Sequence, residues 1–157
     1  MSASSPIIEL HDVRIFQREN LILNNVDFTV HKGEFLYLIG RTGSGKSSLM
    51  RTLYGDLPLA HGEGSVCGFD LRSLKRAQVP YLRRKLGIVF QDFQLLSDRN
   101  VNDNLVFVMK STGWKETKAI DQRVQEVLEQ VGLGNKGYKM PHELSGGEQQ
   151  RVSIARA

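Results

Sequence analysis

Apolar and polar residues alternate along the start of the chain with the period of β-strands. Val26, Phe28 and Val30 are separated by polar residues, which is the pattern of a strand with one buried face. Residues 7–16 show a similar alternation, but its phase changes near Asp12, and a bulge or bend there would reconcile the two halves. Because the connections are short, we expect mostly antiparallel pairing in this β layer.

Two uninterrupted apolar runs of strand length, residues 35–39 and 86–90, each predict a further strand. A shorter strand is predicted at residues 65–69. Residues 72–85 are rich in arginine and lysine, and Pro80 is expected to break this segment in two. Its basic side chains can contact phospholipid headgroups or form a solvated helical face, and the solvated face is the more common case.

The second half of the chain has the period of α-helices. Residues 102–109 and 115–131 are predicted helices, and Gly132 is expected to end the second as a C-terminal cap. The longer helix carries one apolar stripe, with charged residues outside it. The stripe is formed by Ile120, Val124, Val127, Leu128 and Val131. The change of period near Gln91 predicts a helical subdomain inserted in an α/β core.

Length and composition fit one globular domain. The chain has 157 residues, of which 40% are hydrophobic and 24% charged, as is usual for soluble proteins. The single cysteine, Cys67, excludes an internal disulfide. We see no signal peptide and no apolar window long enough to span a membrane. The net charge of +4 is compatible with an anionic lipid surface but does not require one.

Residues 40–47 fit the pattern G-x-x-x-x-G-K-[ST] of a phosphate-binding loop, between a predicted strand and a helix start. Glycines allow the backbone N–H groups to approach phosphate oxygens, with help from the helix dipole. Lys46 can reach the β- and γ-phosphates, and the Ser47 hydroxyl can bind Mg²⁺. A glycine-rich turn with a chance lysine would not explain the flanking elements. The candidate residues are Gly40, Arg41, Thr42, Gly43, Ser44, Gly45, Lys46, Ser47 and Ser48.

Two residues outside the loop are further candidates. Phe16 precedes the loop and can stack on adenine, although an ordinary core or edge phenylalanine explains it equally well. Gln91 follows the apolar run 86–90, and its carbonyl oxygen can bind Mg²⁺ without adding charge. A single glutamine does not by itself indicate a metal ligand. The prediction rests on the position of Gln91 after a predicted strand and downstream of the phosphate loop.

A second anion site is predicted where a helix begins at residue 145. Ser145 and Glu148 have the spacing of a capping box, and Gly146 and Gly147 leave the N–H groups of the first turn unshielded. Glycine costs about 1 kcal/mol at each helical position. Two glycines therefore destabilise the start of the helix, and this indicates that they serve a ligand at this helix end.

These three stretches, in this order, resemble the Walker A motif, the Q-loop glutamine and the LSGGQ signature of the ATP-binding cassette (ABC) ATPases. They are residues 40–48, Gln91 and residues 144–149, with Glu148 at the fifth signature position. The resemblance runs from about Ile7 to the last residue. Residues 89–101 are also similar to the FtsE family of cell-division ATPases, which partner the membrane protein FtsX. Lipoprotein-release and macrolide-export ATPases share much of the rest.

The resemblance implies an α/β fold: a P-loop NTPase core with an antiparallel β layer and an inserted α-helical subdomain. The implied parts of this single ABC domain are a nucleotide-binding core and β layer at 1–91, a helical subdomain at 92–144 and the signature helix at 145–157. It also implies a homodimer that holds MgATP head-to-tail, with Ser47 and Gln91 on Mg²⁺. Phe16 takes the adenine-stacking position, which is usually a tyrosine. Ser145, Gly146 and Gly147 contact the γ-phosphate of ATP held by the other subunit, and Glu148 is counted with them as a nucleotide-binding residue.

The resemblance further implies an integral membrane subunit similar to FtsX as partner. Phe93, Leu95 and Leu96 either contact a coupling helix of this subunit or pack in the local core. The location implied is cytoplasmic, at the inner face of the plasma membrane, and no nucleic acid is expected to bind. The 157 residues hold no Walker B strand ending in Asp-Glu, no D-loop and no switch histidine. They correspond to the first two-thirds of an ATPase, truncated before Walker B, and we expect them to bind nucleotide weakly without useful turnover.

Three functions compete at this point. The first is an ATPase that drives a membrane partner, of the FtsE or the exporter kind. The second is a module that dimerises on ATP without hydrolysis. The third is a chromosome-maintenance ATPase, which the short interval 101–141 argues against because those proteins carry a long coiled coil there.

Overall fold

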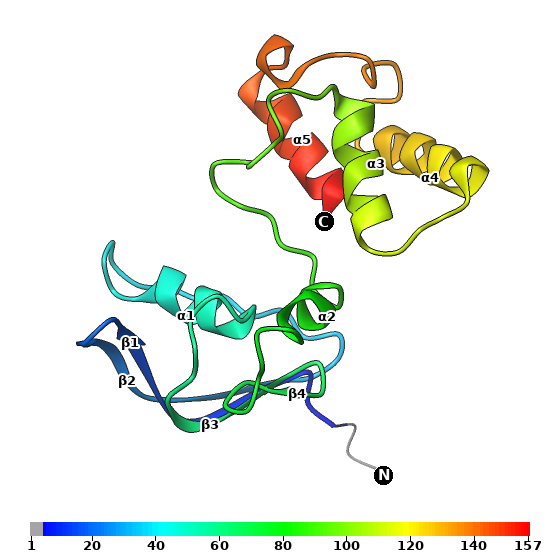
Figure 1. The fold of residues 1–157 in the computed structure, drawn as a ribbon. Helices are drawn as coiled ribbons and strands as arrows, with labels where there is room; N and C mark the ends of the chain where they lie inside the picture. The colour runs from blue at the N-terminus through cyan, green and yellow to red at the C-terminus, as the bar shows by residue number, and fades with distance from the viewer. Residues whose placement is uncertain (1–4) are drawn as a thin grey trace. The chain divides into compact units, whose positions relative to one another are not determined.

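The computed structural model describes residues 5–157, which form two compact units. One unit runs up to Leu86 and the other from Gly87 to Ala157. The first contains the strands and two helices, and the second contains only helices (Figure 1).

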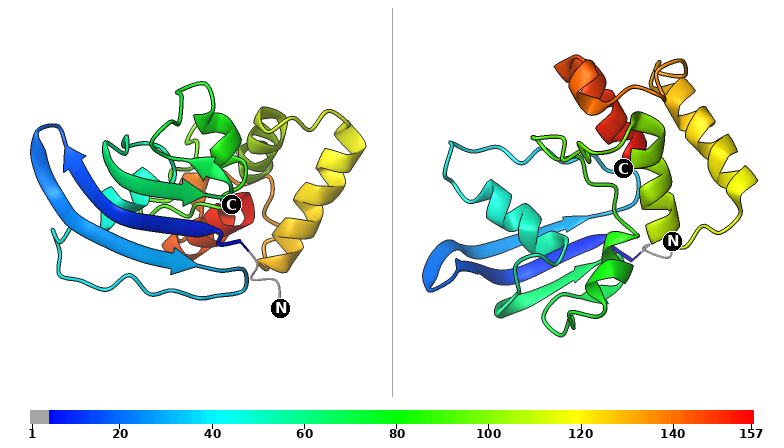
Figure 2. Two further views of the ribbon diagram at one scale, coloured as in Figure 1. Left: turned by 90° about the horizontal axis from the view of Figure 1, so that it is seen from below. Right: turned by 45° about the horizontal axis from the view of Figure 1, so that its top comes forward.

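The first unit is built on a four-stranded antiparallel sheet with the strand order β2-β1-β3-β4. Its strands are β1 (Ile8–Gln17), β2 (Asn20–Val30), β3 (His61–Val66) and β4 (Phe69–Asp70), and its helices are α1 (Lys46–Leu53) and α2 (Val79–Arg83). The long hairpin of β1 and β2 curves strongly in the views of Figure 2. This arrangement confirms the predicted antiparallel β layer.

The predicted irregularity near Asp12 is a bulge in β1. Asp12 has a φ of 44°, and the pairing register with β2 shifts between Leu10 and Val13. The extra residue turns the strand so that Leu10, Val13 and Ile15 are all buried on the core side. The out-of-phase apolar pattern of the sequence is thus resolved by one bulge.

Gly62 packs against this bulge. It has a φ of +84°, and a Cβ built on it would lie 2.4 Å from the Asp12 carbonyl oxygen. We expect Gly62→Ala to lower the free energy of unfolding by about 2–3 kcal/mol, since it adds a backbone clash to the strain of a left-handed residue. Gly68 is a matched control, because its φ is +83° but a Cβ there meets nothing within 4 Å.

Gly68→Ala should cost only about 1 kcal/mol, the cost of the backbone conformation alone. Urea denaturation of both variants measures the difference. Equal losses in the two variants would show that the close approach to Asp12 has no energetic importance.

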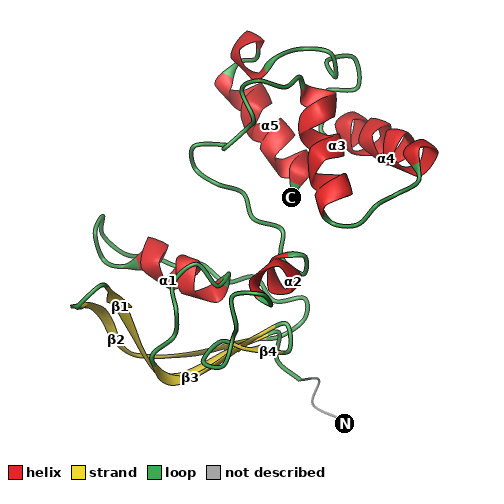
Figure 3. Cartoon of the chain, in the orientation of Figure 1, coloured by secondary structure: helices red, strands yellow, loops and turns green. Residues whose placement is uncertain are grey.

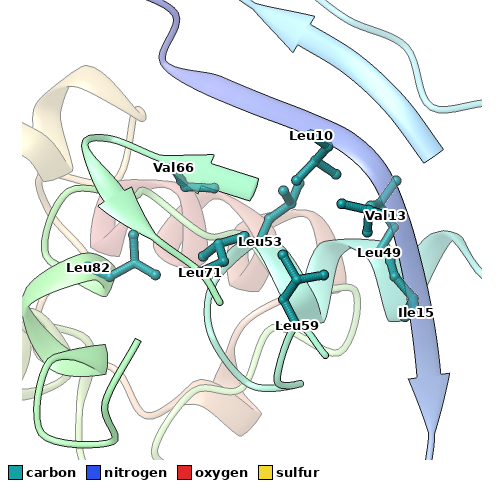
Figure 4. Close-up of a cluster of buried hydrophobic side chains, with 9 residues drawn as sticks. All are labelled: Leu10, Val13, Ile15, Leu49, Leu53, Leu59, Val66, Leu71 and Leu82. Atoms are coloured by element: carbon teal, nitrogen blue, oxygen red, sulfur yellow. The ribbon is translucent and has the colours of Figure 1, made fainter. Parts of the chain in front are cut away.

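The core of the first unit lies between the sheet and its helices. Side chains from β1 and β3 meet Leu49 and Leu53 of α1 and Leu82 of α2 (Figure 4). The buried set is Leu10, Val13, Ile15, Leu49, Leu53, Leu59, Val66, Leu71 and Leu82. This packing fixes α1, and therefore the loop that enters it, on the sheet.

The second unit is a small helical domain. It consists of α3 (Val101–Ser111), α4 (Thr117–Gln130), a short 3-10 helix (Pro141–Glu143) and α5 (Gly146–Arg156). Its core is formed by Val101, Leu105, Ile120, Val124, Leu128, Leu133, Leu144 and Val152. The stripe predicted on the longer helix is confirmed, because its members are buried in this core or packed against it. Gly132, with a φ of +71°, follows the cap of α4 as expected.

The two apolar runs at 35–39 and 86–90 do not form strands, and this part of the prediction is wrong. Both are irregular, and Figure 3 draws the chain between β2 and α1 as loop. Phe35 and Ile39 are 80% and 88% exposed. A strand needs a neighbour for its backbone hydrogen bonds, and no strand within residues 5–157 pairs with either run.

One local prediction is corrected as well. The strand expected at 65–69 is divided, because Cys67 and Gly68 form a tight turn with positive φ between β3 and β4. The segment 72–85 is divided near Pro80 as expected, because residues 72–78 are irregular and α2 begins at Val79. Pro80 lies in the first turn of α2, where its missing N–H costs nothing. Among the described residues, no helix is long and apolar enough to cross a membrane.

Candidate functional site

The glycine-rich loop leads directly into α1. Gly45 is the N-cap residue, with a φ of 93°, and no side chain caps the helix. The N–H groups of the first turn therefore have no intrahelical or side-chain acceptor. They form, with the positive end of the helix dipole, a site suited to an anion.

The Lys46 side chain folds back over this loop. Its ammonium group donates to the carbonyl oxygens of Gly40 at 2.7 Å and Arg41 at 2.8 Å, and to the Ser44 hydroxyl at 3.3 Å. These bonds tie the two ends of the loop to one cation. The positive charge is thereby held at the carbonyl oxygens and the hydroxyl of the loop.

Two glycines of the motif have close neighbours within the first unit. A Cβ at Gly40 would lie 2.6 Å from the Ser44 hydroxyl oxygen, and a Cβ at Gly45 would lie 2.9 Å from the Leu23 side chain on β2. A side chain at Gly45 would push the loop away from the sheet, whereas one at Gly40 would displace the Ser44 hydroxyl that accepts from Lys46. The two glycines therefore matter for the shape of the loop through contacts within the chain itself.

The other loop residues divide by exposure. The side chains of Arg41, Thr42, Ser44 and Ser47 are exposed, so the Ser47 hydroxyl is accessible to a metal ion. Ser48 is buried, and its carbonyl oxygen accepts from the Thr52 hydroxyl at 3.0 Å. The side chain of Ser48 is thus the least accessible of these five. Its backbone N–H, rather than its hydroxyl, is the donor suited to a phosphate.

Phe16 lies near the end of β1 and is half-buried. Its ring contacts the ring of His61 with 5.4 Å between centroids and 48° between planes. Sequence reasoning gave His61 no role, and a contact across 45 residues left no local signal. The role of Phe16 in adenine stacking stays a prediction.

Gln91 lies in a turn of the second unit and is exposed. The residues that follow are held by the end of α5: the Arg156 guanidinium donates to the Phe93 carbonyl at 2.8 Å and to the Gln94 carbonyl. Ser153 donates to the same Phe93 oxygen at 3.3 Å. Partial burial lowers the pKa of Arg156 from its ordinary value. The helix that begins at the signature therefore also anchors the turn after Gln91.

Asn104 is a structural residue that the sequence did not reveal. Its side chain is 1% exposed and bonds the backbone of Leu96, Arg99 and Asn100 with four hydrogen bonds of 2.8–3.1 Å. An asparagine in a helical segment reads as surface, so no pattern marked it. It fixes the loop that connects the Gln91 turn to α3.

The predicted capping box opens α5. The Ser145 hydroxyl accepts from the Glu148 N–H at 3.3 Å, and the Ser145 N–H donates to the Glu148 carboxylate at 2.8 Å. Gly146 and Gly147 follow in helical conformation, and a Cβ on either would meet nothing within 4 Å. Nothing in the packing of the chain itself therefore calls for glycine at these two positions.

Lys136 completes the arrangement at this helix end, and sequence reasoning missed it. Its ammonium group pairs with the second carboxylate oxygen of Glu148. This bond, and then the Ser145 N–H, lower the pKa of Glu148 from 4.5 to about 2. Glu148 is thus engaged on both oxygens within its own chain.

Known proteins match the chain along most of its length. The family model described as ABC transporter matches residues 23–157. The cell division ATP-binding protein FtsE of Streptococcus pneumoniae is 44% identical over 152 residues, with 96% of this chain and 66% of that protein covered. FtsE of Mycobacterium tuberculosis is 48% identical over 135 residues, 86% of this chain and 58% of the relative. The chain thus spans less than two-thirds of the length of these relatives.

Less similar proteins that match the chain are also ATP-binding proteins or cassettes. The methionine import ATP-binding protein MetN of Brucella abortus is 40% identical, with 99% of this chain and 42% of the relative covered. Among solved structures, a dimeric bacterial ABC transporter cassette superposes with a TM-score of 0.85 at 29% identity, covering 95% of this chain and 68% of that one. A dimeric cassette in a post-hydrolysis state, bound to ADP and Pi, gives 0.83 with the same identity and coverage.

Proposed function

This chain belongs to the ABC transporter family, and we propose that it binds MgATP between two copies arranged head-to-tail. The observation that carries the proposal is the pair of glycine-bearing helix starts, one at α1 and one at α5. Each leaves backbone N–H groups free for an anion, and they belong to different units of the chain. Two such ends are what a triphosphate shared between two subunits requires.

The loop before α1 is assigned the triphosphate of the chain's own nucleotide. Its amides and the Lys46 ammonium bind the phosphate oxygens, and the exposed Ser47 hydroxyl and the Gln91 amide oxygen are assigned to Mg²⁺. Both are neutral oxygen donors of the kind Mg²⁺ takes together with phosphate oxygens and water. The ion supplies charge neutralisation at the phosphates. Phe16 is assigned to the adenine.

The start of α5 is assigned the γ-phosphate of ATP held by the partner subunit. Because the Ser145 oxygen accepts from the Glu148 N–H, its own hydrogen remains available for donation to a phosphate oxygen. The N–H groups of Gly146 and Gly147 are the first two of the helix and have no intrahelical acceptor. The absence of side chains there leaves the approach open.

We extend the proposal to ATP hydrolysis by the full-length protein. The 157 residues themselves are proposed to bind nucleotide weakly and to turn it over at no useful rate, since they hold no Asp-Glu pair after an apolar strand. Because several relatives are FtsE proteins named for cell division, we propose that ATP binding drives an integral membrane subunit similar to FtsX at the inner face of the plasma membrane. The MetN match favours a second candidate, the energising subunit of a transporter.

Light scattering coupled to size-exclusion chromatography of the full-length protein tests the proposal. We expect a dimer with saturating ATP under conditions that prevent hydrolysis, and a monomer with ADP. A protein that stays monomeric with ATP would contradict it. Co-purification with candidate membrane subunits, with and without ATP, separates the cell-division role from the transport role.

A further inference from the structure

A negative charge stands where the proposed function needs an anion to bind. Glu148 is the third residue of α5 and follows directly on Gly146 and Gly147. A carboxylate in the first turn is favourable for the helix itself because of the dipole. Toward a γ-phosphate at the same helix end, however, an uncompensated carboxylate is repulsive, since like charges at such short range oppose each other.

The structure shows how this charge is compensated. One oxygen of the Glu148 carboxylate accepts from the Ser145 N–H, and the other pairs with the Lys136 ammonium. The side chains of Lys136 and Glu148 are only 34% and 15% exposed. The pair is therefore less screened by water and salt than a surface ion pair.

Backbone hydrogen bonds link the loop that carries Lys136 to the core of the second unit. The Lys136 N–H donates to the Leu133 carbonyl at 2.9 Å, and the Lys136 carbonyl accepts from the Lys139 N–H at 3.1 Å. Leu133 is fully buried in the core of the second unit. The ammonium group is thus presented to α5 from a fixed base.

We propose that Lys136 is a positioning residue that makes the acidic first turn of α5 compatible with phosphate. It cancels the charge of Glu148 and keeps the carboxylate bonded within its own chain, so that the Ser145 hydroxyl and the Gly146 and Gly147 amides face the partner's nucleotide. This inference rests on the proposed function. It assigns to Lys136 no contact with ATP, only an action through Glu148.

A double-mutant cycle on the full-length protein tests this role. The proteins are the wild type, Lys136→Met, Glu148→Gln and the double variant, and the measurement is the ATP-dependent dimer dissociation constant by analytical ultracentrifugation. Lys136→Met should weaken dimerisation about tenfold. Glu148→Gln supplies the background without the carboxylate charge, and its amide oxygen can still accept from the Ser145 N–H. In the Glu148→Gln background, Lys136→Met should change the constant less than threefold.

Three results would overturn the inference. Equal weakening by Lys136→Met in both backgrounds would mean that lysine attracts the nucleotide directly or supports the fold. An unchanged constant in the single Lys136→Met variant would mean that the charge of Glu148 does not matter. A wild type that stays monomeric with ATP would overturn the proposed function, and the role of Lys136 with it. The wild-type measurement alone separates this outcome from a failure of the Lys136 inference.

An NMR titration of the Glu148 carboxyl group gives an independent readout. The pKa should lie well below its ordinary value in the wild type and rise toward it in Lys136→Met. A pKa that does not move would show that the two side chains are not coupled in solution and would also overturn the inference.

Discussion

Lys46→Ala should lower the affinity of the full-length protein for MgATP at least about a hundredfold while leaving its fold intact. The Lys46 ammonium lies against the glycine-rich loop, where it donates to the carbonyl oxygens of Gly40 and Arg41. Hydrogen bonds from a cation to charged oxygens are worth about 1.5–3 kcal/mol each. Losing more than one of them corresponds to about 3 kcal/mol, or a hundredfold in the dissociation constant.

Arg51→Ala is the matched control for this experiment. Arg51 lies on the same helix and carries the same charge, but it pairs with Asp56 at 2.7 Å and does not touch the loop. Isothermal titration calorimetry with MgATP should find the control within about threefold of the wild type. Equal losses in both variants would mean that general positive charge, rather than this ammonium group, attracts the nucleotide.

Gly147→Ala should change stability and function in opposite directions. A methyl group there meets nothing within 4 Å in the chain, so the free energy of unfolding should rise by about 0.5–1 kcal/mol through helix propensity. The same methyl would stand between the amides of α5 and the partner's γ-phosphate. Losing those bonds should weaken ATP-dependent dimerisation about a hundredfold.

Gln150→Ala provides the control, because Gln150 is exposed, lies on the same helix less than one turn after Gly147, and has no assigned role. Denaturant unfolding and ultracentrifugation of both variants give the two quantities. If Gly147→Ala stabilises the chain and leaves dimerisation unchanged, no phosphate binds at the start of α5.

Local chemistry was readable from the sequence where a feature depends on neighbours along the chain. The bulge at Asp12, the buried stripe of α4, Gly132 after it and the capping box of Ser145 and Glu148 are all of this kind. Each follows from spacing or from one residue's backbone preference. The family assignment rests on the same kind of motif, and the comparisons confirm it.

Features that depend on distant partners were not readable. The runs at 35–39 and 86–90 have the composition of strands, but a strand forms only where another supplies its ladder. The pairing of Lys136 with Glu148 and the hydrogen bonds of Asn104 join segments that no periodicity connects. The adenine role of Phe16 and the metal role of Gln91 stay predictions, because both concern a bound nucleotide.

The measurement that most directly tests the head-to-tail arrangement is a mixing experiment with two defective full-length proteins. Lys46→Ala retains the start of α5, and Gly147→Ala retains the phosphate loop. Neither should dimerise alone with ATP, but an equimolar mixture should form a dimer that binds one ATP, detected by light scattering and nucleotide stoichiometry. A mixture that stays monomeric while the wild type dimerises would contradict the head-to-tail arrangement.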